Sequence, residues 1–153
     1  MVSDHLCAIS WRARPRSFAG LMTLYESNYI RLGWLVPDLR RLHGRLKSVV
    51  DGEPALELAV VEQCRYTTGF QMSYLLADGD VPAREPQLDV RVYHDARLAE
   101  ARGTGMSATH PRLRRLAAGV AWSRGQRWSC NMLLNKWLEY CVESGHRFAA
   151  PAA

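Results

Sequence analysis

The sequence predicts an α+β fold, an antiparallel meander sheet of three to five strands flanked by an N-terminal and a C-terminal amphipathic helix. Three observations lead to this prediction: a helical apolar stripe over residues 18–36, strand-like alternation within residues 56–76, and a second helical stripe over residues 130–142. A helix, a meander and a helix in this order most simply pack both helices on one face of the sheet.

The first helix is predicted from Phe18 to Val36, because apolar side chains recur there every three or four residues. Ser17 can cap its start, and Pro37 ends it because proline cannot continue the helical hydrogen bonds. A short second turn is expected over residues 38–42. The apolar stripe consists of Phe18, Leu21, Met22, Tyr25, Tyr29, Leu32 and Val36.

The middle of the chain changes to the period-two pattern that is typical of strands. Apolar side chains alternate over residues 56–61 and again over residues 66–76. This stretch is too long for one average strand, so we expect a bend or tight turn near Gln63-Cys64.

The second half of the sheet follows a turn signal at residues 78–80, Asp-Gly-Asp. Pro82 and Pro86 are expected to keep the next segment out of a strand ladder. Alternation resumes over residues 88–93, and strand character is expected again around residues 97–102.

The C-terminal helix has the clearest pattern, and Gly145 is its expected C-cap. Cys130 and Cys141 are eleven residues apart, close to three helical turns, so both should face the core as reduced cysteines. Residues 122–129, just before the helix, are expected to be irregular. The helical stripe consists of Cys130, Leu133, Leu134, Trp137, Leu138, Cys141 and Val142.

The length of 153 residues fits one domain. We expect a flexible tail over residues 1–16, the domain over residues 17–147 and a disordered tail over residues 148–153. Because no apolar run approaches the roughly 18 residues that span a bilayer, and no secretory signal is recognised, we expect a cytoplasmic protein without membrane contacts.

The usual motifs of catalytic and metal sites are missing from the sequence. The four cysteines contain no C-x-x-C pair and no zinc-like histidine spacing. No nucleophile turn, glycine-rich phosphate loop or H-E-x-x-H string is found either. We therefore expect no metal and no cofactor, and an enzyme is not the favoured class.

Charge is distributed unevenly along the chain. Residues 1–50 carry a net charge of +5, residues 51–100 of −6 and residues 101–153 of +6. The favoured interpretation is that the basic ends pack beside the acidic middle and partly neutralise it. The alternative is a polarised surface that attracts an anionic partner.

Several local strings, taken together and in order, resemble those of a known family. On these strings the chain, from about residue 18 to residue 145, resembles the YqiB-like family of uncharacterised proteobacterial proteins, a domain of unknown function numbered 1249. That family usually has an acidic stretch where this chain has Arg124-Gly125-Gln126-Arg127. The resemblance implies no particular activity, cofactor or partner. The strings are Phe18, Leu21-Met22, Leu24, Glu26, Asn28-Tyr29, Leu32 and Pro37, then Val61-Glu62, Arg65-Tyr66-Thr67-Thr68, Val90-Arg91, Tyr93-His94-Asp95-Ala96 and Ala99-Glu100, and finally Asn131, Leu134, Trp137-Leu138, Cys141 and Gly145.

Two polar clusters at the ends of predicted strands form the candidate site. Neighbouring strands of a meander can bring such positions within about 5 Å of each other. An arginine beside hydroxyl groups and a histidine would suit a phosphate or a carboxylate. We therefore predict an anion-binding pocket near Arg65 and His94. The clusters are Glu62, Arg65, Thr67 and Thr68, and Tyr93, His94, Asp95 and Glu100.

Other roles for the same residues remain open at this point. His94 with Asp95 or Glu100 could form a general base with an orienting carboxylate, which would make the protein an enzyme. Alternatively, His94 continues the parity of the preceding strand and is a hydrogen-bonded histidine under the sheet. Arg65 with Glu62 or Asp95 could likewise be a structural ion pair that holds a turn.

The segment from Trp122 to Trp128 suggests a further function, because aromatic residues among arginines can stack on bases and contact phosphates. The favoured interpretation is that both tryptophans anchor this segment on the domain, and nucleic acid is a disfavoured partner. The sequence thus predicts a small ligand- or protein-binding regulatory domain whose partner is an anionic small molecule or another protein.

Overall fold

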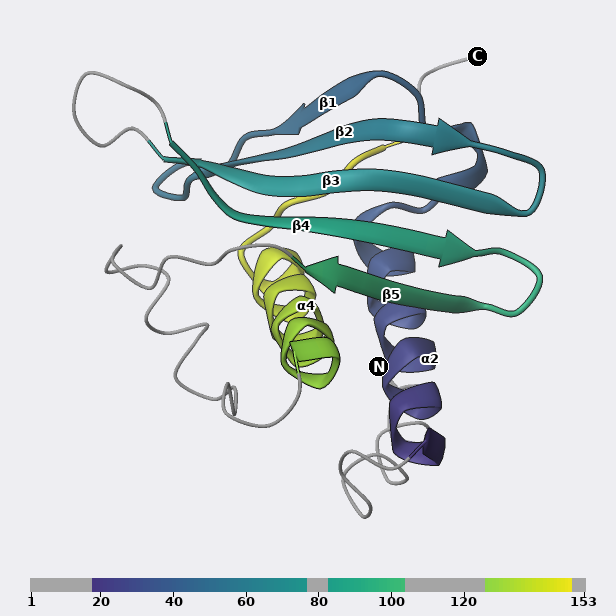
Figure 1. Ribbon diagram of the computed structural model, residues 1–153. Coiled ribbons are helices and arrows are strands. Elements are labelled where there is room, and N and C mark those ends of the chain that lie inside the picture. The colour runs from purple at the N-terminus through teal and green to yellow at the C-terminus, as the bar shows by residue number, and fades with distance from the viewer. Residues whose placement is uncertain (1–17, 77–82, 104–125, 150–153) are drawn as a thin grey trace.

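The computed structural model describes residues 18–76, 83–103 and 126–149, in which two α-helices lie against a five-stranded sheet (Figure 1). The strands are antiparallel and follow one another across the sheet in chain order, which confirms the predicted α+β fold. None of the described helices is long and apolar enough to cross a membrane. The elements are α2 (Phe18–Leu35), the 3₁₀-helix η1 (Leu39–Arg41), β1 (Arg45–Ser48), β2 (Ala55–Gln63), β3 (Thr67–Leu76), β4 (Ala83–Tyr93), β5 (Leu98–Gly103) and α4 (Gln126–Glu143).

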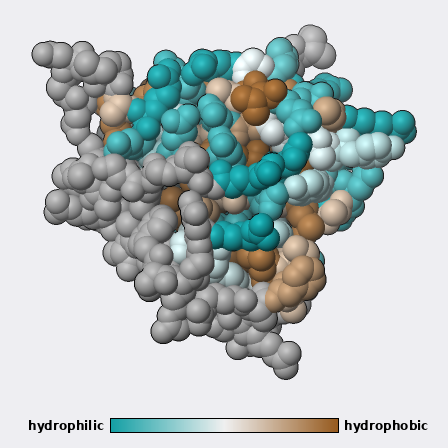
Figure 2. Space-filling view, viewed as in Figure 1, coloured by the Kyte–Doolittle hydropathy of each residue, from teal (hydrophilic) through white to brown (hydrophobic). Residues whose placement is uncertain are grey.

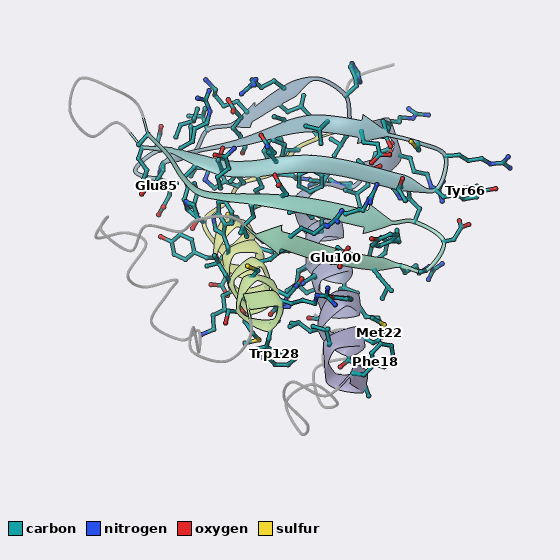
Figure 3. The ribbon with its side chains drawn as sticks, in the orientation of Figure 1. Phe18, Met22, Tyr66, Glu85, Glu100 and Trp128 are labelled. Carbon is teal, nitrogen blue, oxygen red and sulfur yellow. The ribbon has the colours of Figure 1, made fainter. Side chains whose placement is uncertain are left out.

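Helix α2 ends at Leu35, just before the predicted stop at Pro37, but its first turns do not bury the predicted stripe. Phe18 is 78% exposed, because this end of the helix extends beyond the sheet (Figures 1 and 3). Farther along, Leu32 and Leu35 are fully buried in the main core. Polar side chains share this buried face of the helix, and their partners are described below.

The sheet buries one parity of its central strands against the helices. Leu58 on β2 lies opposite Met72 on β3, which lies opposite Leu88 on β4, and all three side chains are buried. The predicted turn after Gln63 is confirmed, because the main-chain N–H of Cys64 donates to the carbonyl of Thr67 at 2.8 Å. Strand β1 was not predicted, since its four residues are too few for a clear alternation.

Pro86 lies inside β4, so the expectation that it keeps this segment out of a ladder is wrong. The pairing of β3 with β4 shifts register between Ser73 and Leu75, beside this proline. Proline has no N–H to donate, and a register irregularity is a place where the ladder does not need that donor.

Helix α4 begins at Gln126, earlier than predicted, so residues 126–129 are helical and not irregular. Trp128 in its first turn is 9% exposed and packs with Leu24 of α2. This contact joins the two helices at the ends that extend beyond the sheet (Figure 3).

The predicted C-cap of α4 is confirmed at Gly145, which has a φ of +99°. The N–H of Gly145 donates to the carbonyl of Val142 at 3.1 Å, and the N–H of His146 donates to the carbonyl of Cys141 at 2.9 Å. This pair of bonds closes the last turn as a Schellman motif. The predicted burial of Cys130 and Cys141 is also confirmed.

The main core lies between the two α-helices and one face of the sheet. Its largest fully buried side chains are Trp137, Tyr74 and Phe70. Phe148, which lies in the segment predicted as a tail, also packs in this core, and its N–H donates to the carbonyl of Leu35 at 2.9 Å. Seen from the same side as Figure 1, the surface over the sheet is mostly hydrophilic (Figure 2).

The outer edge of β5 is covered by side-chain amides from the helices. The N–H of Ala101 donates to Oδ1 of Asn131 at 2.8 Å, and Nδ2 of Asn131 donates to the carbonyl of Ala101 at 3.2 Å. Asn28 donates in turn to the carbonyl of Ala99 at 3.4 Å. An amide side chain offers the same donor and acceptor as a peptide group, so Asn131 acts as one further ladder pair for this edge strand.

The edge-covering asparagines belong to a largely buried set of polar contacts between the helices, which we call the helix ladder. Asn28 donates to Oδ1 of Asn131 at 3.2 Å, and Asn135 donates to Oδ1 of Asn28 at 3.1 Å. Arg31, whose side chain is 6% exposed, reaches Glu139 at 3.3 Å. The α4 members recur every four residues and therefore share one face of that helix. The helix ladder consists of Ser27, Asn28, Arg31, Asn131, Asn135 and Glu139.

Replacing Asn131 with alanine is expected to destabilise the domain by about 2–4 kcal/mol, because several buried groups would lose their partner at once. Urea unfolding followed by circular dichroism measures the change. Glu143→Ala, an exposed change on the same helix, should stay within about 0.5 kcal/mol of the unsubstituted protein. An Asn131→Ala protein as stable as Glu143→Ala would show that the edge of β5 does not need this amide.

Candidate functional site

A β-bulge at the end of β2 determines which side chains reach the helix-covered face of the sheet. The register with β3 shifts between Val60 and Glu62, after which Gln63 pairs with Thr68. Because a strand alternates faces at every residue, the extra residue turns Gln63 toward the helices and Glu62 toward the uncovered face. Without the bulge, the alternation that begins with Leu56 and Leu58 would place Glu62 toward the helices and Gln63 toward the uncovered face.

Gln63 is held by the main chain that follows α2. Its Nε2 donates to the carbonyl of Leu42 at 2.8 Å and to that of Leu39 at 3.2 Å. Since carbonyl oxygens only accept, the amide orientation is defined, and Oε1 of Gln63 faces the opposite way. There it accepts a hydrogen bond from the hydroxyl of Thr68.

Thr68 also contacts His94, a residue that follows the end of β4 and is 5% exposed. Nε2 of His94 lies 2.7 Å from Oγ1 of Thr68. The hydroxyl has one hydrogen, and Gln63 receives it, so Nε2 of His94 must be the donor in this contact. The neutral imidazole therefore keeps its hydrogen on Nε2 and has an unprotonated Nδ1. We call the chain Gln63–Thr68–His94 the relay.

His94 lines a pocket of about 310 Å³ between α2 and the segment after it, which we call the His94 pocket. Its helical wall is formed by Tyr29, Ile30, Gly33 and Trp34, followed by Val36. The other lining residues are Pro37, Asp38, Leu39, Arg40 and His94, which we call the polar wall. The helical wall is thus mainly apolar, and the polar wall carries the charged groups.

Arg40 supplies the positive charge of the His94 pocket. Its Nη1 donates to the main-chain carbonyl of Arg65 at 3.0 Å, and its Nη2 lies 3.7 Å from Asp95. A guanidinium has five N–H donors, so these contacts leave others for a ligand. Burial lowers the pKa of His94, the charge of Arg40 lowers it further, and Asp95 opposes the change. His94 is therefore neutral at physiological pH.

The remaining predicted residues lie mainly on the uncovered face. Glu62 pairs with Arg91 at 2.7 Å, and the hydrogen bond from Arg91 holds the pKa of Glu62 below its usual value. Tyr93 donates to Glu100 at 2.7 Å, and Tyr25 of α2 also hydrogen-bonds this carboxylate. Glu100 belongs to the edge strand β5 (Figure 3).

The structure thus brings only part of the predicted cluster together. Thr68 and His94 are in contact, while Thr67, which pairs with Tyr93, is on the other face with Glu62 and Glu100. The guanidinium of Arg65 lies 5.3 Å from the ring of Tyr66, which extends from the β2–β3 turn (Figure 3). Asp95 contacts Arg40. The arrangement supports a binding pocket better than a histidine–carboxylate pair.

Sequence reasoning missed Gly33, Trp34 and Arg40 of the His94 pocket, and Gln63 of the relay. Arg40 and His94 are far apart in the chain, and Gln63 reaches the relay only because of the bulge, so local patterns did not indicate either contact. Trp34 fell outside the predicted apolar stripe. A signal did exist for Gly33, because a glycine inside a helix costs about 1 kcal/mol relative to alanine.

The other candidate chemistries receive little support from the described residues. Among them, no group of three or more His, Cys, Asp and Glu side chains could hold a metal ion. Trp128 is buried against Leu24 and does not present its ring to a base. Trp122 and its neighbouring arginines lie outside the described residues.

Comparisons with known proteins cover most of the chain. A family described as "Protein of unknown function (DUF1249)" matches residues 31–147. The chain is 28% identical to the "Uncharacterized protein YqiB" of Escherichia coli K12 over 138 residues, which cover 84% of this chain and 90% of the relative. The proteins of the same description from the E. coli strains O6:H1 and O157:H7 match equally well. No solved structure matches the chain.

Replacing His94 with glutamine, whose amide can still donate to Thr68, is expected to remove part of the acid sensitivity of the fold. The folded pKa of His94 is lowered, so its contribution is fully present above the unfolded value of about 6.5 and is lost as the pH falls below it. Urea unfolding at about pH 7.5 and about pH 5 measures the effect. The unsubstituted protein should lose more free energy of unfolding between these two pH values than His94→Gln does. An equal loss in both proteins would contradict the assigned burial of a neutral imidazole.

Proposed function

The chain belongs to the DUF1249 family of proteins of unknown function, and from its geometry we propose that it is a binding domain for a small organic acid, which it holds in the His94 pocket. The observation that carries this proposal is that Arg40 and His94, the latter left with an unprotonated Nδ1 by the relay, line one pocket together with apolar residues of α2. The volume of about 310 Å³ is at the lower end of the range for small-molecule sites, which favours a small ligand.

Arg40 is the group that we expect to bind the acid. A guanidinium recognises a carboxylate or a phosphate through paired N–H donors. The carbonyl of Arg65 and the carboxylate of Asp95 both contact the Arg40 guanidinium. The predicted anion-binding role near Arg65 and His94 is thus proposed for Arg40 and His94, with Arg65 contributing its main chain.

A protein partner is less well supported. The exposed large apolar side chains of the described residues are Phe18, Val49, Val61 and Tyr66. They come from α2, the loop after β1, β2 and the β2–β3 turn, and they do not point to one extended patch.

A thermal-shift screen with small carboxylates and inorganic phosphate tests the proposed function. A ligand at a hundred times its Kd adds about 2.7 kcal/mol of stability, which should raise the Tm by a few degrees. Arg40→Gln should abolish this shift, whereas Arg65→Gln, a matched change of an exposed arginine nearby, should retain it. No shift with any acid, or a shift that Arg65→Gln alone abolishes, would contradict the proposal.

A further inference from the structure

We infer that the acid taken by the His94 pocket is an aromatic monocarboxylate that also carries a hydroxyl or N–H donor, an inference that rests on the function proposed above. Three features of the pocket lead to this class: the wall around Gly33, the pairing of a cation with an acceptor, and the acidic groups at the rim.

The wall around Gly33 fits a flat ring. Tyr29 and Trp34 line the pocket on either side of this glycine in the helix sequence. A Cβ at Gly33 would meet no atom within 4 Å, so the described fold does not require glycine there. Glycine is unfavourable inside a helix, and its missing side chain leaves bare backbone that a planar molecule can approach.

Trp34 contacts an arginine of its own helix. The guanidinium carbon of Arg31 lies 5.9 Å from the ring of Trp34, and Arg31 is itself fixed by Glu139 at 3.3 Å. Aromatic pairs gain more than their buried area alone accounts for. A ring already held by the protein favours an aromatic ligand over an aliphatic one of the same size.

The polar wall favours a ligand that carries both an anionic group and a hydrogen-bond donor. The N–H groups that Arg40 does not use can bind an anion, whereas Nδ1 of His94, left without hydrogen by the relay, can only accept a hydrogen bond. A ring that carries a carboxylate at one end and a hydroxyl or N–H at the other meets both requirements.

The acidic groups at the rim limit the ligand to one negative charge. Asp38 lines the pocket and pairs with Arg41 at 3.3 Å, and Asp95 lies beside Arg40. A second negative charge on the ligand would approach these carboxylates without a further cation among the lining residues. A monocarboxylate is therefore favoured over a phosphate dianion.

Isothermal titration calorimetry of the full chain at about pH 7.5 tests the inferred class, with para-hydroxybenzoate, benzoate, the ring-saturated analogue of para-hydroxybenzoate and inorganic phosphate as probes. We expect para-hydroxybenzoate to bind roughly tenfold more tightly than benzoate and than the saturated analogue, with phosphate weakest. Gly33→Leu, whose side chain enters the pocket, should abolish binding, and Gly33→Ala should weaken it. Their circular dichroism spectra and Tm values show whether both variants remain folded.

The outcomes separate this inference from the proposed function. If all the acids bind with equal affinity, or phosphate binds best, and Arg40→Gln abolishes binding, the inferred ligand class is overturned while the acid-binding function stands. Binding that both folded Gly33 variants leave unchanged would also overturn the class. If none of the four probes binds, the class and the function are both overturned.

Discussion

The two hydrogen bonds between Asn131 and the main chain of Ala101 are the interaction on which the rest of the structure depends. The last strand of a meander presents unpaired N–H and C=O groups, and here a helix that packs beneath the sheet also provides the missing ladder pair. Asn131 is held at this edge by Asn28, which donates to it and which in turn accepts a hydrogen bond from Asn135. The helix ladder therefore determines where α2 and α4 lie under the sheet, and with them the wall of the His94 pocket.

A side-chain amide has a similar role at the end of β2. Gln63 binds two main-chain carbonyls of the segment after α2, as Asn131 binds the main chain of β5. The consequence differs, because the free oxygen of Gln63 continues through Thr68 to a titratable group. The bonds of Gln63 to these carbonyls thus also determine which nitrogen of His94 carries a hydrogen. A contact that stabilises the fold therefore determines that His94 has an unprotonated Nδ1.

The sequence predicts the fold of this protein better than its site. Helical and strand periods, Pro37 and Gly145 were sufficient to predict the two helices and the meander, because these signals act within a few residues. The parity of β4 even placed His94 under the sheet, where it is buried. The bulge at the end of β2 could not be predicted, since the alternation before it is regular, and it reverses the faces of Glu62 and Gln63. The approach of Arg40 to His94 depends in turn on how the segment after α2 crosses the strand ends, which no local pattern encodes.

The protonation of the His94 ring tests the account most directly, because the relay and the chemistry of the pocket both depend on it. Nitrogen NMR of the ¹⁵N-labelled protein at neutral pH, with His94→Gln used to assign the signals, distinguishes a protonated ring nitrogen from an unprotonated one. The account predicts a neutral ring with its hydrogen on Nε2 and an unprotonated Nδ1. A hydrogen on Nδ1 would contradict the relay, and the pocket would then offer a donor where we propose an acceptor.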